Sequence, residues 1–331
     1  MINAAIIGLG WWGRHIVNTL QGESDKIFFS RGVDIAPAAA ADVAKDKGIV
    51  VTESYVDALN DPDIDAIVLA TPHSLHEEQI VAAAKAGKHV FCEKPLALTL
   101  ASAVISVAAC EEAGVVLGLG HERRFEPAMQ EIARLVTSGL LGDIMHVEAN
   151  FSHDKLANLA GNNWRVSPTE SPAAAMTATG IHITDSYANM FGPVEQVFAM
   201  TATRNPANAN GDILNFSLRF KSGATGAFNS VLETPLYMRF AVFGSKAWVE
   251  ARDYSHPSEV GPTDLFISRR EGEIETQTLQ YVDTVKLNFE AWVDAIDGVT
   301  DYPFTRAQKL ENIAVFEAIC QSVETGLPVT L

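Results

Sequence analysis

The feature that most constrains the fold is an apolar run that leads directly into closely spaced glycines. The run AAII (4–7) has the composition of a buried strand, and GLGWWG (8–13) follows it at the start of a helical segment. In a strand–turn–helix unit of this kind, Gly8 permits a tight turn, Gly10 lets a ligand approach the backbone, and Gly13 allows close packing of helix on strand. The helix N-terminus then presents unpaired N–H groups to a phosphate. This part of the chain therefore predicts a dinucleotide-binding turn.

Strand-like and helix-like segments continue to alternate up to residue 120. In order along the chain, these segments are KIFFSRGVD (26–34), the Ala-rich stretch 37–47, DAIVLAT (65–71), SLHEEQIVAAAKAG (74–87), KHVFCEK (88–94), LTLASAVISVAACEEAG (98–114) and VVLGLG (115–120). Apolar runs separated by helices are typical of a parallel sheet that is covered on both faces. We therefore predict an α/β Rossmann dinucleotide-binding domain over residues 1–121.

The pattern changes in the second part of the chain, where strand-like segments follow one another without helices between them. Expected strands lie at 143–151, 194–202, 212–220, 224–232, 237–243, 247–252, 264–269 and 274–280, and expected helices at 127–138, 173–191, 284–298 and 305–325. Turns that contain glycine favour hairpins. We predict a second, α+β domain over residues 122–331 with a large, mostly antiparallel open sheet, used for substrate binding and oligomerisation. Its uncovered apolar face favours a homodimer or homotetramer.

Composition excludes several classes of protein. The formal net charge of −17 argues against nucleic acid and anionic membranes as partners. No apolar run is long enough to cross a bilayer, and the first residues lack the features of a secretory signal, so a cytoplasmic protein is expected. Cys92, Cys110 and Cys320 are widely spaced and odd in number, which supports neither a disulfide framework nor a thiolate zinc site. No metal is implied.

An acidic residue after the second expected strand indicates which dinucleotide binds. Asp34 lies 21 residues beyond Gly13. A carboxylate there accepts hydrogen bonds from a ribose 2′-OH and repels a 2′-phosphate, which favours NAD. Arg31 is close enough to Asp34 in the sequence that NADP stays an alternative cofactor. Trp11 and Trp12 are expected either to line the cofactor site or to pack beside it.

Two further expected strands end in polar residues, in LATPHSLH (69–76) and FCEKPL (91–96). Ligands of such sheets bind beyond the carboxyl ends of the strands, so these turns should surround the nicotinamide half of the cofactor. Lys94 is a candidate catalytic group because a nearby cationic ring favours the neutral amine, which can accept a substrate proton. A salt bridge to Glu93 or a hydrogen bond to ribose is the alternative role.

Three parts of the sequence together resemble a known family: GLGWWG (8–13), the stretch from DAIVLATPHSLH to FCEKPLALT, and TGIHITD (179–185). The family is the Gfo/Idh/MocA family of NAD(P)-dependent oxidoreductases. The resemblance covers the N-terminal half and continues through NWR (163–165) and SVETGLPVTL (322–331). It implies hydride transfer between a nicotinamide cofactor and a secondary alcohol or ketone of a sugar, cyclitol or related small molecule. It also implies that Lys94 is catalytic. The other residues that the resemblance places at the cofactor are Thr71, Pro72, His76, Glu93, Pro95, Trp164 and Arg165.

The chain departs from the family pattern at one catalytic position. Many members carry an aspartate four residues before a histidine, on the same helical face. Here the histidine is His182, and Ala178 occupies the earlier position. We expect His182 and Lys94 to share proton transfer, with Asp185 orienting the imidazole. The alternatives are a catalytically altered NAD-binding protein, and an NAD-dependent glycosidase that works by transient oxidation and elimination.

Substrate contacts are expected from residues outside these motifs. Arg123 and Arg124 in GHERRFEP (120–127) follow the last Rossmann strand and are candidates for binding a substrate anion or the cofactor, or for a salt bridge between domains. The loop before Trp164 offers His153, Asn162 and Asn163, although residues in such loops are more often solvated.

Overall fold

The computed structural model describes residues 1–157, 159, 163–206, 208 and 210–331, and the chain divides into two compact units. The first unit contains Met1–Glu122 and Asp283–Leu310, and the second contains Arg123–Val282 and Glu311–Leu331. A parallel Rossmann sheet occupies the first unit and a mostly antiparallel sheet the second, so the predicted fold class is confirmed. None of the described helices combines the length and hydrophobicity that crossing a membrane requires.

The Rossmann sheet has the strand order β3-β2-β1-β4-β5-β6, and every neighbouring pair in it is parallel. The order reverses between β1 and β4, which creates a switch point at the carboxyl end of β1. Its elements are β1 (Ile2–Ile7), α1 (Trp11–Leu20), β2 (Ile27–Val33), α2 (Ala41–Lys47), β3 (Val50–Thr52), α3 (Tyr55–Asn60), β4 (Ala66–Leu69), α4 (His76–Lys85), β5 (His89–Cys92), α5 (Leu100–Ala113) and β6 (Leu117–Leu119).

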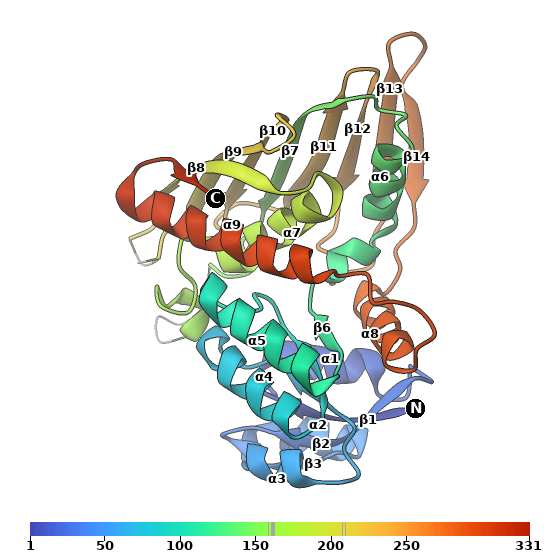
Figure 1. The fold of residues 1–331 in the computed structure, drawn as a ribbon, viewed down its shortest axis with the longest axis vertical. Coiled ribbons are helices and arrows are strands. Elements are labelled where there is room, and N and C mark those ends of the chain that lie inside the picture. Colours follow the sequence, from blue (N-terminus) through green and yellow to red (C-terminus); the bar gives the residue numbers. More distant parts are fainter. Residues whose placement is uncertain (158, 160–162, 207, 209) are drawn as a thin grey trace. The chain divides into compact units, whose positions relative to one another are not determined.

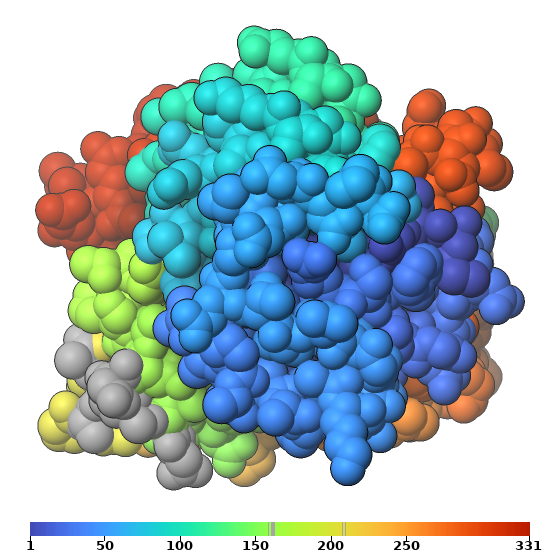
Figure 2. All heavy atoms as spheres, turned by 90° about the horizontal axis from the view of Figure 1, so that it is seen from below, coloured from blue at the N-terminus to red at the C-terminus, as the bar shows by residue number. Residues whose placement is uncertain are grey.

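A helix from the far end of the sequence completes this unit. In α8 (Thr284–Ile296), Phe289 stacks on Phe91 of β5 with ring centroids 3.8 Å apart, and the Trp292 indole donates to the Val116 carbonyl at 3.2 Å. A Cβ at Gly118 would lie only 2.6 Å from the Phe91 ring, so glycine makes room for this packing. Figure 2 shows the orange segment that contains α8 beside the dark blue N-terminal elements, in agreement with the contact between α1 and α8. Residues Asp283–Leu310 thus group with the Rossmann sheet in the first unit, because these aromatic side chains pack against it.

His89 at the start of β5 makes the first unit sensitive to acid. The Val116 N–H donates to His89 Nδ1 at 3.0 Å, which requires that nitrogen to be unprotonated. Burial lowers the pKa of His89, although the carboxylates of Asp65 and Asp297 oppose the shift. The unfolded chain then binds the proton more readily, so the free energy of unfolding falls as the pH drops below about 6.5.

We therefore expect His89→Gln to reduce the loss of stability between about pH 7 and pH 5, because the titrating group is removed. Urea unfolding of both proteins across this range measures the effect. If the unfolding free energy of variant and wild type changed equally with pH, the acid sensitivity could not be assigned to His89.

The second unit is built on a sheet with the order β14-β13-β12-β11-β7-β10-β9-β8-β15. Neighbouring strands are antiparallel apart from β7 and β10, which are parallel. The strands are β7 (Ile144–Ser152), β8 (Val194–Ala202), β9 (Ile213–Phe220), β10 (Thr225–Val231), β11 (Tyr237–Gly244), β12 (Ala247–Asp253), β13 (Thr263–Arg269), β14 (Glu275–Leu279) and β15 (Val329–Thr330).

Helices lie on one face of this sheet. Figure 1 shows α6 (Pro127–Thr137), α7 (Ile181–Met190) and α9 (Arg306–Thr325) on the same side. Alternate residues of β7 are buried on that side, namely Val147, Ala149 and Phe151. The period of two follows from the strand pleat, and it means that the covered face supplies the core of this unit.

Candidate active site

The glycine turn between β1 and α1 is shaped by backbone contacts. Gly8 has φ of +90°, and a Cβ there would lie 2.7 Å from the Ala70 carbonyl oxygen. A Cβ at Gly13 would lie 1.9 Å from the Gly8 oxygen. At Gly10 a Cβ would meet nothing within 4 Å. Gly8 and Gly13 are therefore required by the local packing, whereas Gly10 leaves open space beside the N-terminus of α1, as an approaching pyrophosphate needs.

Asp34 follows β2 and is held against this turn. Its carboxylate accepts from the Leu9 N–H at 2.7 Å and from the Ala36 N–H at 2.9 Å. The nearby Arg31 guanidinium is paired with Asp61 at 2.6 Å. The Asp34 carboxylate therefore lies beside the glycine turn. The Arg31 side chain, which left NADP as an alternative cofactor in the sequence analysis, is already paired with the Asp61 carboxylate. These residues fit a dinucleotide that carries an unmodified ribose.

The two tryptophans differ in their surroundings. Trp11 is 61% exposed at the first turn of α1, whereas Trp12 packs against the hydrophobic core of the unit. Their ring centroids are 5.4 Å apart, and Trp12 lies 4.8 Å from the ring of His15. Trp11 is therefore the more accessible of the two indoles, and Trp12 packs against the core. Contact of either indole with the cofactor stays a prediction.

The turn after β4 is tied to the turn after β5 by a buried imidazole. His76 has no exposed surface, and its Nδ1 lies 2.9 Å from the Pro95 carbonyl oxygen. Its Nε2 lies 3.2 Å from the carbonyl oxygen of Thr71, whose hydroxyl donates to Gln79 at 2.6 Å. Pro72 follows at the half-buried start of the next turn. His76 therefore positions the two turns, and Thr71 and Pro72 form the accessible part.

Glu93, Lys94 and Pro95 leave β5 through a cis Lys94–Pro95 peptide. The Glu93 carboxylate is buried and accepts from the Lys94 N–H at 3.3 Å. A Cβ at Gly120 would lie 2.4 Å from the Glu93 Oε2 atom. Gly120 thus makes room for the acid, a role that sequence reasoning missed although the residue directly follows the last Rossmann strand. Lys94 is half-buried at the carboxyl edge of the sheet.

The cysteines are poor nucleophiles. Burial raises the pKa of Cys92 well above its usual value, and burial raises the pKa of Cys110 to about 12. Burial also raises the pKa of Cys320 to about 12. Each thiol therefore stays protonated near neutral pH, and none offers the thiolate that covalent chemistry or metal binding needs.

In the second unit, His182 lies in the first turn of α7, which is preceded by a strained segment. Ala173 and Ala174 have φ of 57° and 53°, in the left-handed region that favours glycine. A π-helical turn, Met176–Gly180, follows and contains Ala178. Backbone strain and π turns cluster at functional sites, so this region is a candidate for one.

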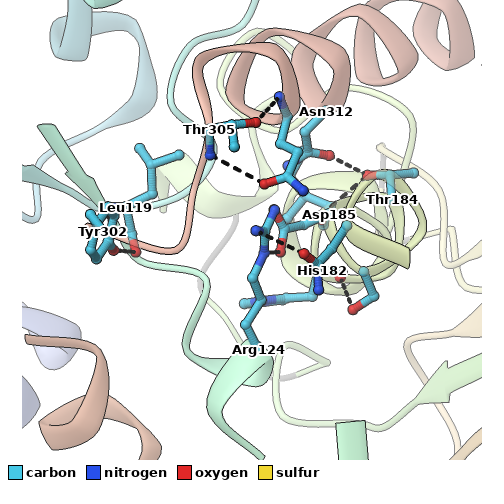
Figure 3. A network of polar contacts seen from close by, with 12 residues as sticks. Leu119, Arg124, His182, Thr184, Asp185, Tyr302, Thr305 and Asn312 are labelled. Atoms are coloured by element: carbon cyan, nitrogen blue, oxygen red, sulfur yellow. Dashed lines mark hydrogen bonds and ion pairs between the residues drawn. The ribbon is translucent and has the colours of Figure 1, made fainter. Parts of the chain in front are cut away.

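A buried ion pair anchors α7. Arg124 donates from Nε and Nη2 to the two carboxylate oxygens of Asp185, each at 2.7 Å, and both side chains are about 5% exposed or less. Arg124 also lies 3.3 Å from the Asn189 amide oxygen, and Thr184 donates to Asn312 at 2.6 Å (Figure 3). Both groups of this ion pair belong to the second unit. Asp185 primarily holds Arg124, and its orientation of His182 stays a prediction.

The remaining expected site residues are spread over two segments. His153 is buried directly after β7. Asn163 accepts the Arg165 N–H at 3.0 Å and so caps a short turn, in which the Arg165 guanidinium lies 4.2 Å from the centre of the Trp164 ring. Asn162 and residues 207 and 209 lie outside the described part of the chain. Within that described part, no group of three or more His, Cys, Asp or Glu side chains is arranged to hold a metal ion.

The fold and the glycine turn define an oxidoreductase with an NAD-binding Rossmann domain. Residues 2–121 match the model of an oxidoreductase family described by that fold, and residues 129–250 match the Gfo/Idh/MocA C-terminal domain. The chain belongs to the Gfo/Idh/MocA family, as its sequence motifs predict.

Individual relatives cover most of the chain. The 1,5-anhydro-D-fructose reductase of Ensifer adhaerens is 26% identical over 330 residues, which span 98% of this chain and 96% of the relative. The myo-inositol 2-dehydrogenase of Thermotoga maritima is 31% identical over 269 residues, 74% of either chain. The crystal structure of an aldose-aldose oxidoreductase from Caulobacter crescentus complexed with glycerol has a TM-score of 0.88 and 26% identity, and the match covers 100% of this chain and 99% of that one.

Proposed function

We propose that this protein is an NAD-dependent dehydrogenase that oxidises a secondary alcohol of a sugar, cyclitol or related polyol, or reduces the corresponding ketone. The observation that carries the proposal is the convergence of three groups at the carboxyl edge of one parallel sheet. The glycine turn follows β1, Asp34 follows β2, and Lys94 follows β5. The reductase and dehydrogenase relatives named above support the choice of substrate class.

The residues of the first unit have distinct roles in holding the cofactor. The backbone at Gly10 and the N-terminus of α1 bind the pyrophosphate, and Asp34 accepts the ribose hydroxyl. The Arg31–Asp61 pair supports NAD over NADP. The remaining proposed cofactor contacts are Trp11, Thr71, Pro72, Glu93 and Pro95 in the first unit and Trp164 and Arg165 in the second.

Proton transfer falls to two residues. When bound, NAD supplies the acceptor for the hydride. The neutral Lys94 amine accepts a hydrogen bond from the substrate hydroxyl and takes its proton. His182 acts as the second proton carrier, since an imidazole exchanges protons near neutral pH and Ala178 has no group that can do so. Asp185 and Arg124 position the helix that carries His182.

A cofactor-reduction screen tests the proposal. The protein is incubated with NAD or NADP and a panel of polyols, cyclitols, hydroxy acids, dihydrodiols and glycosides, and reduced nucleotide and products are quantified. Stoichiometric NADH from a free polyol is the expected result. Glycoside cleavage without net NADH would instead identify the oxidation–elimination glycosidase. Nucleotide binding without any turnover would identify a catalytically altered NAD-binding protein.

We expect Gly10→Val to weaken NAD binding by about 10- to 100-fold without unfolding the protein, since the side chain enters open space needed by the pyrophosphate. Calorimetric titration with NAD and thermal melting measure the two effects separately. Gly13→Ala is the contrasting variant, because its Cβ meets the Gly8 oxygen and should lower the melting temperature of the apo protein. If Gly10→Val bound NAD with the wild-type affinity, the pyrophosphate could not be assigned to this turn.

The second unit also supports a proposal about assembly. On the face of its sheet opposite the helices, Phe198 and Met200 of β8 are 38% and 56% exposed. A second copy of the chain would bury such apolar side chains, so a homodimer or homotetramer is proposed. Light scattering coupled to gel filtration decides the state, and a monomer at all concentrations would exclude it. The cytoplasmic location stays a prediction.

A further inference from the structure

Side chains from the far end of the sequence hold the outer edge of the Rossmann sheet. β6 is the last strand in the sheet order, so its outer backbone groups point away from β5. The Leu119 N–H donates to the Tyr302 hydroxyl at 3.1 Å (Figure 3), and the Asn288 amide donates to the Leu119 carbonyl at 2.8 Å. Two residues earlier, the Lys309 amine donates to the Leu117 carbonyl at 2.8 Å. Both backbone groups of Leu119 are thus bound by side chains.

The two side chains at Leu119, which we call the edge pair, also bind each other. The Tyr302 hydroxyl lies 2.7 Å from the Asn288 Oδ1 atom and 3.2 Å from the Leu119 carbonyl oxygen. A phenol carries one proton, so it donates to the closer acceptor, Asn288, while it accepts the Leu119 N–H. Asn288 is 1% exposed, so water does not readily replace these bonds. Loss of either member of the edge pair should therefore loosen the backbone at Leu119.

Direct contacts connect the end of β6 to the candidate catalytic lysine. Gly120, which follows Leu119, donates its N–H to the Cys92 carbonyl of β5 at 2.9 Å. A Cβ at Gly120 would lie 2.4 to 2.7 Å from the three atoms of the Glu93 carboxylate, so the acid rests against this backbone. The same carboxylate is 7% exposed and accepts the Lys94 N–H at 3.3 Å. The Glu93 carboxylate therefore lies between the backbone of Gly120 and that of Lys94, and it transmits a shift of one to the other.

Proton transfer is sensitive to such a shift. A general base must lie within hydrogen-bond distance of the proton that it takes, and a displacement of about 1 Å caused by a distant change can lower the rate about 100-fold. The Lys94 amine is carried on a flexible four-carbon chain, so its position depends on a backbone that is held firmly. The contacts of Glu93 with both strand ends provide that support.

We propose that Asn288 and Tyr302 are positioning residues for Lys94, which act through the end of β6 and the Glu93 carboxylate. This inference rests on the proposed function, because it takes Lys94 to be the group that accepts the substrate proton. The edge pair lies 169 and 183 residues from Leu119 in the chain, so no local motif in the sequence marks it.

The test uses Tyr302→Phe and Asn288→Ala. Tyr302→Phe keeps the ring, which stacks on Phe304 with centroids 4.9 Å apart, and removes only the hydroxyl. For the alcohol oxidised fastest in the screen, each variant should lower kcat by about 10- to 100-fold, with smaller changes in KM and NAD affinity. Lys309→Met is the matched control, because it removes a hydrogen bond to the same strand two residues before Leu119. It should lower the melting temperature about as much as Tyr302→Phe but keep the wild-type kcat.

A second measurement needs no cofactor. In the apo protein, the reaction of lysine amines with an acylating reagent at mildly alkaline pH is followed residue by residue by mass spectrometry. Lys94 should react about 2- to 10-fold faster in both edge-pair variants, since the loss of one hydrogen bond makes opening of the strand end more frequent by about that factor. The exposed Lys85 is the internal reference and should react at the wild-type rate. Lys94 should also react at the wild-type rate in Lys309→Met.

These outcomes separate the positioning role from the dehydrogenase activity. A wild-type kcat in Tyr302→Phe, or an equal loss of kcat in Lys309→Met, would overturn the positioning role even if the enzyme oxidises polyols. If the wild-type protein oxidises no alcohol, the proposed function fails, and the acylation of the apo protein decides alone. Faster reaction of Lys94 in the two edge-pair variants only then supports the positioning role. A wild-type rate in these variants, or the same increase in Lys309→Met, overturns it in either case.

Discussion

Replacement of Lys94 with methionine is expected to lower kcat by a factor of about 10²–10⁴ while NAD still binds. Methionine keeps much of the length of the side chain but has no group that can take a proton from a hydroxyl. Lys94→Arg should lose similar activity, since a guanidinium keeps positive charge but does not give up its proton near neutral pH. Steady-state kinetics on the alcohol from the screen and calorimetric titration with NAD measure the two effects.

Lys85→Met is the control for this experiment, because Lys85 is exposed near the end of α4 in the same unit. It should retain wild-type turnover. If Lys94→Met also retained wild-type turnover, proton transfer would have to be assigned to another group. If Lys94→Arg were active and Lys94→Met inactive, catalysis would depend on the positive charge of residue 94 and not on proton transfer by its side chain.

Breaking the ion pair between Arg124 and Asp185 is expected to have the largest effect on stability. Asp185→Asn leaves the guanidinium buried with a neutral partner, and removal of one member of a buried pair costs about 3–5 kcal/mol of unfolding free energy. The double variant Arg124→Met with Asp185→Leu should be less damaging, because no uncompensated charge remains. Urea unfolding monitored by circular dichroism gives the three free energies.

An exposed pair provides the comparison. Glu131 and Arg134 form a bidentate pair on α6, and the Arg134 side chain is 61% exposed. The Arg134 guanidinium lowers the pKa of Glu131, yet Glu131→Gln should cost less than about 1 kcal/mol because water screens the charges. If Asp185→Asn lost no more unfolding free energy than Glu131→Gln, the buried pair would not anchor α7.

The structure of the Rossmann unit was predictable where it depends on residues that are close together in the sequence. The turn at Gly8 needs a positive φ, and Gly13 faces an oxygen only five residues away, so a short motif encodes both. Asp34 could be located by its spacing from the turn. The antiparallel sheet was predictable for a similar reason, since alternate burial along strands such as β7 leaves a period of two in the sequence.

Contacts between distant residues were not predictable in this way. An amphipathic helix at 284–298 shows that one face will be buried, but nothing local indicates that Phe289 will stack on Phe91. Likewise, Asp185 is three residues from His182 on the same helix, which suggested an interaction between them. Its carboxylate binds Arg124, which is 61 residues away in sequence.

The sequence by itself determined the class of fold, the dinucleotide turn and the lysine at the strand end, because each depends on the conformation or spacing of residues within one strand–turn–helix unit. Only the tertiary structure decided that Arg31 pairs with Asp61 and that Arg124 is paired within the second unit. These choices depend on which side chains of a buried surface meet, and that is settled by packing across the whole unit.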